Sequence, residues 1–324
     1  MIDLRSDTFT HPTQSMRDAM ATAEVGDDVY QEDPTVQKLE ILAAEKMGKE
    51  AGLLVPSGCM GNLISVLSHC GRGDEILLGN RSHISLYEVG GVSALGGVHP
   101  RPLPNNDDGT ISTDLLEKGI RHSDIHCPPT RLICLENTHN FCQGSPLTPE
   151  YMTEVREIAD KFGLKIHLDG ARIFNAAVAL GVPVSKLTEK VDSVMFCLSK
   201  GLSAPVGSLV CGSSDFIHKA RKARKMVGGG MRQAGHIAAA GLVAITELVD
   251  RLQEDHDNAK FLASQLSELV GVEVDISRIK TNIIFFKITG INGETLLNQL
   301  ENNQIKILMT DSGIFRAVLH RDIS

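Results

Sequence analysis

The order of apolar and amphipathic segments predicts an α/β protein, with a mainly parallel central sheet covered by helices on both faces and a smaller C-terminal α+β domain. Short apolar runs typical of buried strands lie at residues 53–55, 75–78, 132–136, 165–168, 193–198 and 207–211. A second group follows at residues 272–274, 283–288, 305–309 and 315–319, with a helical pattern at 294–301. We therefore expect a large domain at residues 1–245, which includes the N-terminal segment, and a small domain at residues 246–324.

Two helical patterns support this division. Residues 149–162 carry apolar side chains at helical spacing, with Thr148 placed to cap the helix and Pro149 at its first position. A longer pattern without proline runs from Ala234 to about Leu269. A helix of that length often connects two domains, so we expect it to link the large domain to the small one.

Composition excludes several classes of function. The 324 residues are 42% hydrophobic, enough for a sizeable core, and 40 acidic against 32 basic residues give a formal charge of −8. No Lys or Arg run suggests nucleic-acid binding. The longest apolar stretches fall short of the roughly 20 residues of a membrane span. The N-terminus resembles neither a signal nor a transit peptide, so a cytoplasmic protein is expected.

The seven cysteines include no Cys-x-x-Cys pair. The absence of that pair argues against a zinc site, and the odd number of cysteines argues against a disulfide framework. We expect reduced, mostly buried thiols and no bound metal.

The first chemical candidate is Asp169, which follows the apolar strand at 165–168 and precedes Gly170. In open α/β sheets ligands lie beyond the carboxyl ends of the strands. A carboxylate there can pair with a pyridinium nitrogen, but it can equally cap the next helix.

The second candidate is Lys200, which follows the apolar strand at 193–198. A lysine near a hydrophobic strand end is partly desolvated, which favours imine formation with an aldehyde, although many such lysines are simple surface residues. The 31 residues (200 − 169) between Asp169 and Lys200 leave room for one helix and one strand. Both side chains can therefore reach the same edge of the sheet.

Two glycine-containing segments are candidate anion sites. One is the turn through Gly58 and Cys59, where a strand leads into a helix whose backbone N–H groups suit a phosphate. The other is the run Gly228–Gly230 followed by Arg232, which presents a guanidinium at the start of the long helical pattern. Either one alone is also compatible with an ordinary loop.

Six segments, read together from residue 2 to about residue 320, resemble the L-threonine aldolase family in order and spacing. They are Leu4-Arg5-Ser6-Asp7-Thr8, Val25-Gly26-Asp27-Asp28-Val29-Tyr30, Leu135-Glu136-Asn137-Thr138-His139-Asn140, His167-Leu168-Asp169-Gly170-Ala171-Arg172, Leu198-Ser199-Lys200-Gly201-Leu202 and Gly228-Gly229-Gly230-Met231-Arg232-Gln233. The resemblance implies a fold-type-I pyridoxal 5′-phosphate (PLP) enzyme of the aspartate-aminotransferase-like architecture. It also implies a homotetramer built from tight dimers.

The resemblance also implies roles for individual residues. Lys200 would be the Schiff-base lysine, Asp169 the partner of the pyridine nitrogen, and His83 the residue over the cofactor ring. The phosphate would be held by Gly58, the backbone at Cys59, and Arg232 reaching across the dimer interface. The substrate would be bound by Ser6, Arg172, Arg316, Tyr30 and Tyr87, with Arg172 also beside the cofactor.

The reaction implied is retro-aldol cleavage of L-threonine or L-allo-threonine to glycine and acetaldehyde. A pair of arginine forks suits the substrate carboxylate because it fixes orientation as well as charge. His83 and His126 are both candidates to take the β-hydroxyl proton, directly or through water. Cys59 departs from the family, which commonly has a hydroxyl residue at the phosphate turn, and a thiol is a weaker donor.

The sequence is also compatible with two other functional interpretations. A different PLP-dependent lyase or aminotransferase can use the same lysine and aspartate, because these residues do not distinguish reactions. A non-enzymatic scaffold is disfavoured, because Lys200, Asp169, Arg172 and Arg316 are all present together.

Overall fold

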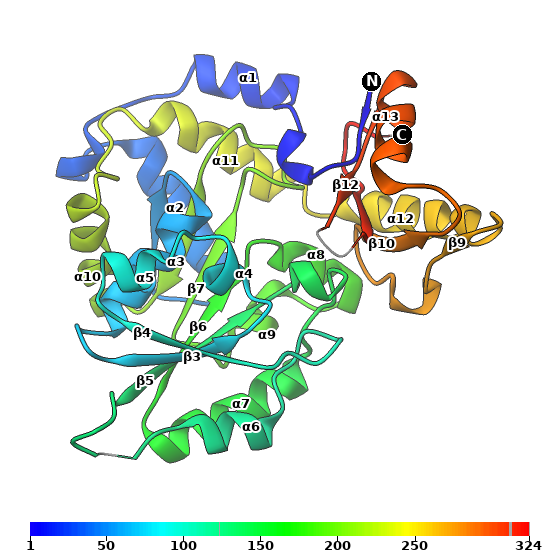
Figure 1. The fold of residues 1–324 in the computed structure, drawn as a ribbon. Helices are drawn as coiled ribbons and strands as arrows, with labels where there is room; N and C mark the ends of the chain where they lie inside the picture. The colour runs from blue at the N-terminus through cyan, green and yellow to red at the C-terminus, as the bar shows by residue number, and fades with distance from the viewer. Residues whose placement is uncertain (123, 311–312, 324) are drawn as a thin grey trace.

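A seven-stranded sheet forms the centre of the computed structural model, which describes residues 1–122, 124–310 and 313–323 (Figure 1). Its strands, in spatial order, are β2 (Ala51–Val55), β8 (Ser208–Gly212), β7 (Ser193–Cys197), β6 (Lys165–Asp169), β5 (Thr130–Glu136), β3 (Glu75–Gly79) and β4 (His99–Leu103). β4, β3, β5, β6 and β7 run parallel to one another. β8 is antiparallel to both of its neighbours. The predicted α/β fold with a mainly parallel sheet is confirmed.

Two apolar layers enclose this sheet, because successive strand residues point to opposite faces. In β2, Leu53 and Val55 belong to one apolar core together with Ile64 of α3 (Gly58–His69) and Phe216 of α10 (Ser214–Met226), whereas Leu54 belongs to the core on the other face. The helices of the large domain are α1 (Gln14–Ala21), α2 (Pro34–Met47), α3 (Gly58–His69), α4 (His83–Leu86), α5 (Gly91–Ala94), α6 (Thr113–Gly119), α7 (Pro149–Phe162), α8 (Ile173–Leu180), α9 (Val184–Thr188), α10 (Ser214–Met226) and α11 (Gly235–Glu247). Helices therefore cover both faces of the sheet, as predicted.

Helix α7 begins and ends where the sequence predicts. The Thr148 side chain accepts a hydrogen bond from the Tyr151 N–H, and Pro149 is the first helical residue. Gly163 ends the helix with a left-handed backbone, φ 66°.

The single long helix expected from Ala234 to about Leu269 is wrong. The structure has two helices, α11 and α12 (Leu252–Ser267), separated by a turn at residues 248–251. α11 packs against α1 and α2, whereas α12 packs against α8. One straight helix cannot make both sets of contacts, and Leu252, the first residue of α12, is fully buried at the turn.

The C-terminal elements form a small antiparallel sheet packed against α12. Its order is β12 (Leu308–Met309), β13 (Phe315–Val318), β10 (Ile283–Ile288) and β9 (Val272–Glu273), accompanied by α13 (Gly293–Asn302). β1 (Ile2–Asp3) pairs in parallel with β11 (Ile305–Lys306), and Leu4 belongs to the small core. The N-terminus therefore lies beside the small domain (Figure 1). The predicted boundary between residues 245 and 246 stays a prediction.

Four short 3₁₀ helices within the described ranges connect these elements: η1 (Asp7–Phe9), η2 (Asp28–Tyr30), η3 (Asn140–Cys142) and η4 (Ile276–Arg278). Among the described residues, no helix is both long enough and apolar enough to cross a membrane.

Candidate active site

Asp169 is the last residue of β6 and is almost completely buried at the carboxyl edge of the parallel strands. Its Oδ1 accepts a hydrogen bond from the Ala171 N–H at 3.0 Å, and its Oδ2 accepts one from the Asn62 amide at 2.9 Å. Burial, reinforced by the charges of Glu136 and Glu88, raises the pKa of Asp169 to about 6. Asp169 does not cap α8, because the residue that precedes this helix is Arg172.

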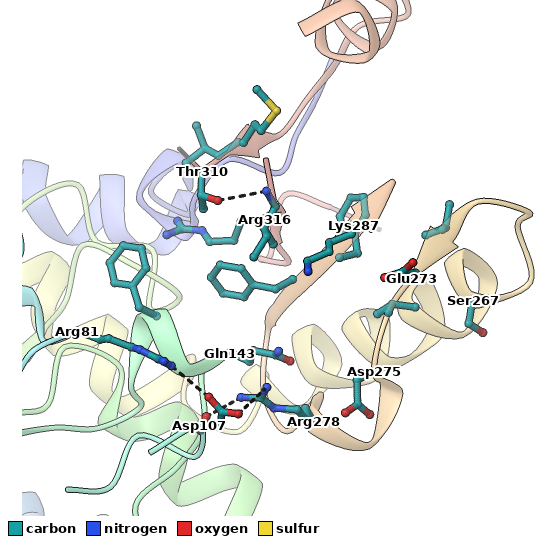
Figure 2. A pocket seen from close by; sticks show the side chains of 18 of the residues that line it. Arg81, Asp107, Gln143, Ser267, Glu273, Asp275, Arg278, Lys287, Thr310 and Arg316 are labelled. Carbon is teal, nitrogen blue, oxygen red and sulfur yellow. Dashed lines mark hydrogen bonds and ion pairs between the residues drawn. The ribbon is translucent and has the colours of Figure 1, made fainter. Parts of the chain in front are cut away.

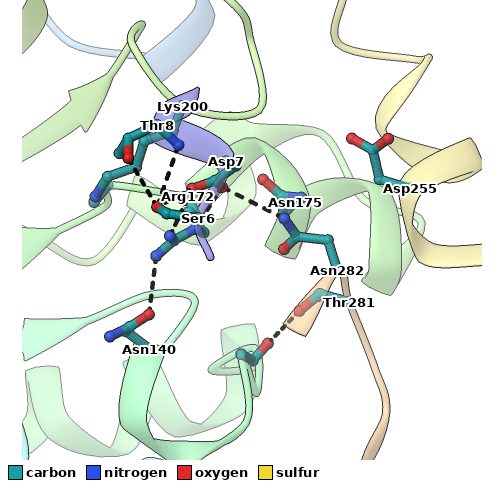
Figure 3. A network of polar contacts seen from close by, with 12 residues as sticks. Ser6, Asp7, Thr8, Asn140, Arg172, Asn175, Lys200, Asp255, Thr281 and Asn282 are labelled. Carbon is teal, nitrogen blue, oxygen red and sulfur yellow. Dashed lines mark hydrogen bonds and ion pairs between the residues drawn. The ribbon is translucent and has the colours of Figure 1, made fainter. Parts of the chain in front are cut away.

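Lys200 lies three residues beyond the end of β7, at the same edge of the sheet. Its backbone carbonyl accepts hydrogen bonds from the Thr10 hydroxyl at 3.0 Å and the Ser203 N–H at 2.8 Å. The charge of its ammonium group favours the ionised form of both Asp169 and Asp7, although burial still raises the pKa of Asp169 overall. Figure 3 shows Lys200 beside Thr8, Ser6 and Asp7 of the N-terminal segment.

His83 is the first residue of α4 and lies close enough to Asp169 for each to shift the pKa of the other. Its backbone N–H donates to Glu136 at 2.7 Å, and its Nδ1 lies 2.9 Å from Glu88 Oε1. The hydrogen bond to Glu88 raises the pKa of His83 above its usual value. Glu88 therefore makes this imidazole a stronger base.

The turn at Gly58 forms the start of α3, after the cap residue Ser57. A Cβ at Gly58 would lie 2.9 Å from Cys197 Sγ, so only glycine fits between α3 and β7. The first N–H groups of a helix have no helical acceptor, and those of Gly58 and Cys59 are therefore available to an anion.

The side chain of Cys59 faces His83 and Glu88. Its Sγ, a His83 ring nitrogen and a Glu88 carboxylate oxygen all lie within 4.8 Å of one another. Loss of solvation and the charge of Glu88 raise the pKa of the Cys59 thiol to about 11. The thiol is therefore neutral near pH 7. These three side chains are close enough to share a metal ion, although the sequence predicts no metal site.

A buried cationic cluster lies on the other side of Lys200. Arg172 donates from Nε and Nη2 to the two Asp7 carboxylate oxygens, both at 2.7 Å, and from Nη1 to Asn140 Oδ1 at 3.3 Å (Figure 3). Arg316 donates to the same Asn140 oxygen at 3.4 Å and to the Arg5 carbonyl at 3.0 Å. Burial and the charge of Arg172 lower the pKa of Arg316 to about 10. Two guanidinium groups and one carboxylate leave this cluster with a net positive charge.

A cleft of about 1150 Å³ lies between the large and small domains and reaches this cluster at Arg316 (Figure 2). The residues that line it include Arg81, Tyr87, Phe141, Lys287 and Arg316. Tyr87 stacks on Phe141, with ring centroids 5.0 Å apart, and lies 5.9 Å from the His83 ring. Ser6, the cap of η1, accepts hydrogen bonds from the N–H and hydroxyl of Thr8.

Three predicted site residues are not brought to Asp169 within a single chain. His126 lies in the exposed segment before β5, at the opposite end of that strand from Glu136, and is bonded to Asp124. Arg232 is exposed and pairs with Asp27 at 2.9 Å. Tyr30 is 71% exposed on the neighbouring η2. Their assignments stay predictions.

Sequence reasoning did not single out several polar residues of the site: Asp7, Asn62, Glu88, Glu136 and Asn140. All five are buried or nearly so. Asp7, Glu136 and Asn140 lie inside the segments that carried the family resemblance, so that signal was present. Asn62 lay in the helix after the phosphate turn, and its part in the site is evident only from its contact with Asp169.

Comparison with known proteins identifies relatives along the whole chain. The family described as beta-eliminating lyase matches residues 3–289. Low-specificity L-threonine aldolase 1 of Arabidopsis thaliana is 50% identical, over 100% of this chain and 92% of its own length. Low specificity L-threonine aldolase of Escherichia coli K12 is 46% identical, over 100% of this chain and 95% of its own length.

Solved structures share the fold at low sequence identity. A threonine aldolase of Leishmania major matches with a TM-score of 0.83 and 19% identity, covering 99% of this chain and 94% of its own. A putative L-allo-threonine aldolase of Listeria monocytogenes matches with a TM-score of 0.82 and 17% identity, covering 98% and 90%. Because it is 46–52% identical over its full length to these low-specificity L-threonine aldolases, this chain belongs to the low-specificity L-threonine aldolase family, within the beta-eliminating lyases.

Proposed function

We propose that this protein is a PLP-dependent aldehyde-lyase that cleaves L-threonine or L-allo-threonine to glycine and acetaldehyde. The observation that carries this proposal is that a buried carboxylate, Asp169, and an amine, Lys200, lie at the same edge of the parallel sheet. The names of its relatives support the same activity.

The residues present suit the cofactor. Lys200 would hold PLP through its amine, Asp169 would pair with the ring nitrogen, and the N–H groups of Gly58 and Cys59 would bind the phosphate. The tight fit of Gly58 against Cys197 keeps this helix start free of a side chain. Bound PLP supplies an electron sink for the pair of electrons released when the Cα–Cβ bond breaks.

The positive cluster suits the carboxylate of an amino-acid substrate. Arg316 has a buried Nε with no hydrogen-bond partner in the described part of the chain, so it retains donor capacity. Asp7 already occupies the fork of Arg172. We therefore assign the direct carboxylate contact to Arg316 and propose that Arg172, held by Asp7, adds positive charge beside it. Ser6 and Tyr87 would complete the substrate contacts.

The proton of the β-hydroxyl needs an acceptor near Asp169 and Lys200. His83 lies in this region, and Glu88 increases its basicity, which favours it as the base. His126 remains the alternative. Because His126 lies at the opposite end of β5 in its own chain, it would have to come from another subunit.

The proposal extends to assembly and location. Arg232 and Tyr30 lie together on exposed segments away from Asp169, which suits residues that complete the site of a neighbouring chain. A homotetramer of tight dimers and a cytoplasmic location, both expected from the sequence, belong to this proposal.

The test is a product assay with added PLP and L-threonine, L-allo-threonine or L-serine as the substrate. We expect glycine and acetaldehyde from both threonine isomers. Ammonia or a keto acid as the main product, without acetaldehyde, would identify another PLP lyase or an aminotransferase instead.

A further inference from the structure

Behind Asp169, a continuous line of hydrogen bonds runs between α3 and the central sheet, buried except at its outer end, where His69 is half-buried. Its members come from three elements, α3, β6 and β7. Asn62 and His69 lie seven residues apart on one face of α3, and His167 lies two residues before Asp169 on one face of β6. Ser193, the first residue of β7, lies between the two histidines. Asn62, His167 and Ser193 are at most 1% exposed.

The orientation of the Asn62 amide is fixed by its neighbours. Its Nδ2 donates to Asp169 Oδ2 at 2.9 Å and to Glu88 Oε1 at 2.7 Å. Ionised carboxylates only accept hydrogen bonds, so a flipped amide would place its oxygen against both. Asn62 Oδ1 must therefore face His167 Nε2, at 3.1 Å, and His167 Nε2 must carry the proton.

The remaining proton positions follow in turn. Burial lowers the pKa of His167 to about 3 and outweighs an opposing hydrogen bond with the Ser193 backbone, so this ring is neutral. With its one proton on Nε2, its Nδ1 is a bare acceptor. Ser193 lies 2.9 Å away and donates its only hydroxyl proton to that nitrogen. The Ser193 oxygen must then accept from His69 Nε2, at 2.8 Å. Burial lowers the pKa of His69 to about 4, so a neutral ring with its proton on Nε2 satisfies this contact.

Every donor in this line thus points toward Asp169. We propose that the line from His69 to Asn62, here called the His69 relay (His69, Ser193, His167 and Asn62), keeps Asp169 ionised and oriented for the ring nitrogen of the cofactor. Aligned hydrogen bonds polarise one another, so the positive ends of these groups accumulate at the carboxylate. The relay opposes the burial and neighbouring charges of Glu88 and Glu136, which favour a protonated Asp169. Its members are positioning residues, because only Asp169 would touch the cofactor.

This inference deepens the proposed function and rests on it. Ser193→Ala tests the relay at its centre, because it removes the donor to His167 and the acceptor for His69 with little loss of volume. Ser65→Ala is the matched control: Ser65 is equally buried and lies on α3 between Asn62 and His69. Among the described residues, its hydroxyl bonds only to the Gly61 carbonyl of its own helix. His69→Leu is a second variant, which leaves Ser193 in place and should have a smaller effect in the same direction.

The first readout needs no cofactor. Nitrogen NMR of the ¹⁵N-histidine-labelled protein should show His167 protonated at Nε2 and bare at Nδ1 in the wild type and in Ser65→Ala. Finding the His167 proton on Nδ1 in the wild type overturns the relay. This result does not depend on whether PLP binds, so it separates failure of the relay from failure of the proposed function.

The second readout uses the holoenzyme loaded with ¹⁵N-labelled PLP. In Ser193→Ala the ring-nitrogen signal should move toward the unprotonated position, and kcat should fall about fivefold with KM nearly unchanged, as expected for one lost neutral hydrogen bond. Ser65→Ala should match the wild type in both. If the ring-nitrogen signal of Ser193→Ala and His69→Leu equals that of the wild type, the relay does not act on Asp169.

Discussion

Arg172 and Asp7 form a buried bidentate ion pair, with both nitrogen–oxygen distances at 2.7 Å, although 165 residues separate them in the sequence. The pair ties the N-terminal segment to the turn after β6, next to Lys200 (Figure 3). Asp7 also occupies the two guanidinium N–H groups of Arg172 that could otherwise bind a substrate carboxylate. The two arginines of the cluster therefore have different expected roles, with Arg172 held in place by Asp7 and Arg316 facing the cleft.

Asp7→Asn should lower the free energy of unfolding by about 3 kcal/mol at pH 7, because it leaves the Arg172 charge buried and unpaired. Denaturant titration measures this change. Asp107→Asn is the control: Asp107 is 73% exposed and pairs with Arg81, and exposed pairs contribute at most about 1 kcal/mol. Equal losses in the two variants would contradict the account.

The same pair predicts a pH dependence of stability. Burial alone would raise the pKa of Asp7, but Arg172 outweighs it and holds this pKa below its usual value. A carboxyl whose pKa is lower in the folded than in the unfolded protein stabilises the fold at pH values above its unfolded pKa of about 3.9. This stabilisation is lost as the pH falls toward the pKa of the folded state. The stability difference between wild type and Asp7→Asn should therefore shrink below about pH 4. A constant difference between pH 7 and pH 3 would rule out this ionisation.

Arg316→Lys should raise KM for L-threonine at least about tenfold and leave PLP content near normal. A lysine presents a point charge and cannot reproduce the fork of an arginine, and a lost hydrogen bond to a charged group costs about 1.5–3 kcal/mol. Steady-state kinetics of acetaldehyde release measure the effect. Arg81→Lys, at the rim of the same cleft, should remain close to wild type. Unchanged kinetics in Arg316→Lys would remove this residue from the substrate site.

Cys59→Thr should slow the release of PLP on dilution about fivefold while activity is retained. The neutral thiol is a weak donor, whereas a hydroxyl at the start of α3 adds roughly 1 kcal/mol through one hydrogen bond to the phosphate. Cys127→Thr, in the segment before β5, serves as the control. Faster release from Cys59→Thr would mean that this side chain does not face the phosphate.

Mixing Lys200→Ala with Arg232→Ala subunits should restore activity if Arg232 completes the site of a neighbouring chain. Neither variant alone has a complete site, but one site in each hybrid dimer receives both intact residues. Subunit exchange is verified by mass. Exchange without any gain in activity would show that both residues act within one chain.

The sequence predicted the buried strands and α7 because these elements depend on local patterns, apolar runs in the strands and the Thr148 and Pro149 signals in the helix. It missed β4, whose five residues include Pro100 and Pro102. Proline has no N–H to donate, so it is tolerated here only because β4 is an edge strand that pairs with β3 alone.

The sequence predicted the site residues that lie at the ends of apolar strands. It did not predict those whose place depends on contacts between segments far apart in the sequence. Asp169 and Lys200 follow apolar strands, so the sheet alone brings them to one edge. Asn62 reaches Asp169 across 107 residues of sequence, and no local period indicates that contact. Arg232 and His126 lie away from Asp169 in one chain and pair there with Asp27 and Asp124. The sequence of a single chain does not show how neighbouring subunits are placed, so their predicted roles stay predictions.

The most direct test of the central claim is chemical labelling of the lysine that holds the cofactor. The purified protein should be yellow with PLP, and borohydride should reduce the imine and fix the cofactor to a single peptide. Mass spectrometry of that peptide should identify Lys200, and Lys200→Ala should retain no label. A label on any other lysine would contradict the assignment of the whole site.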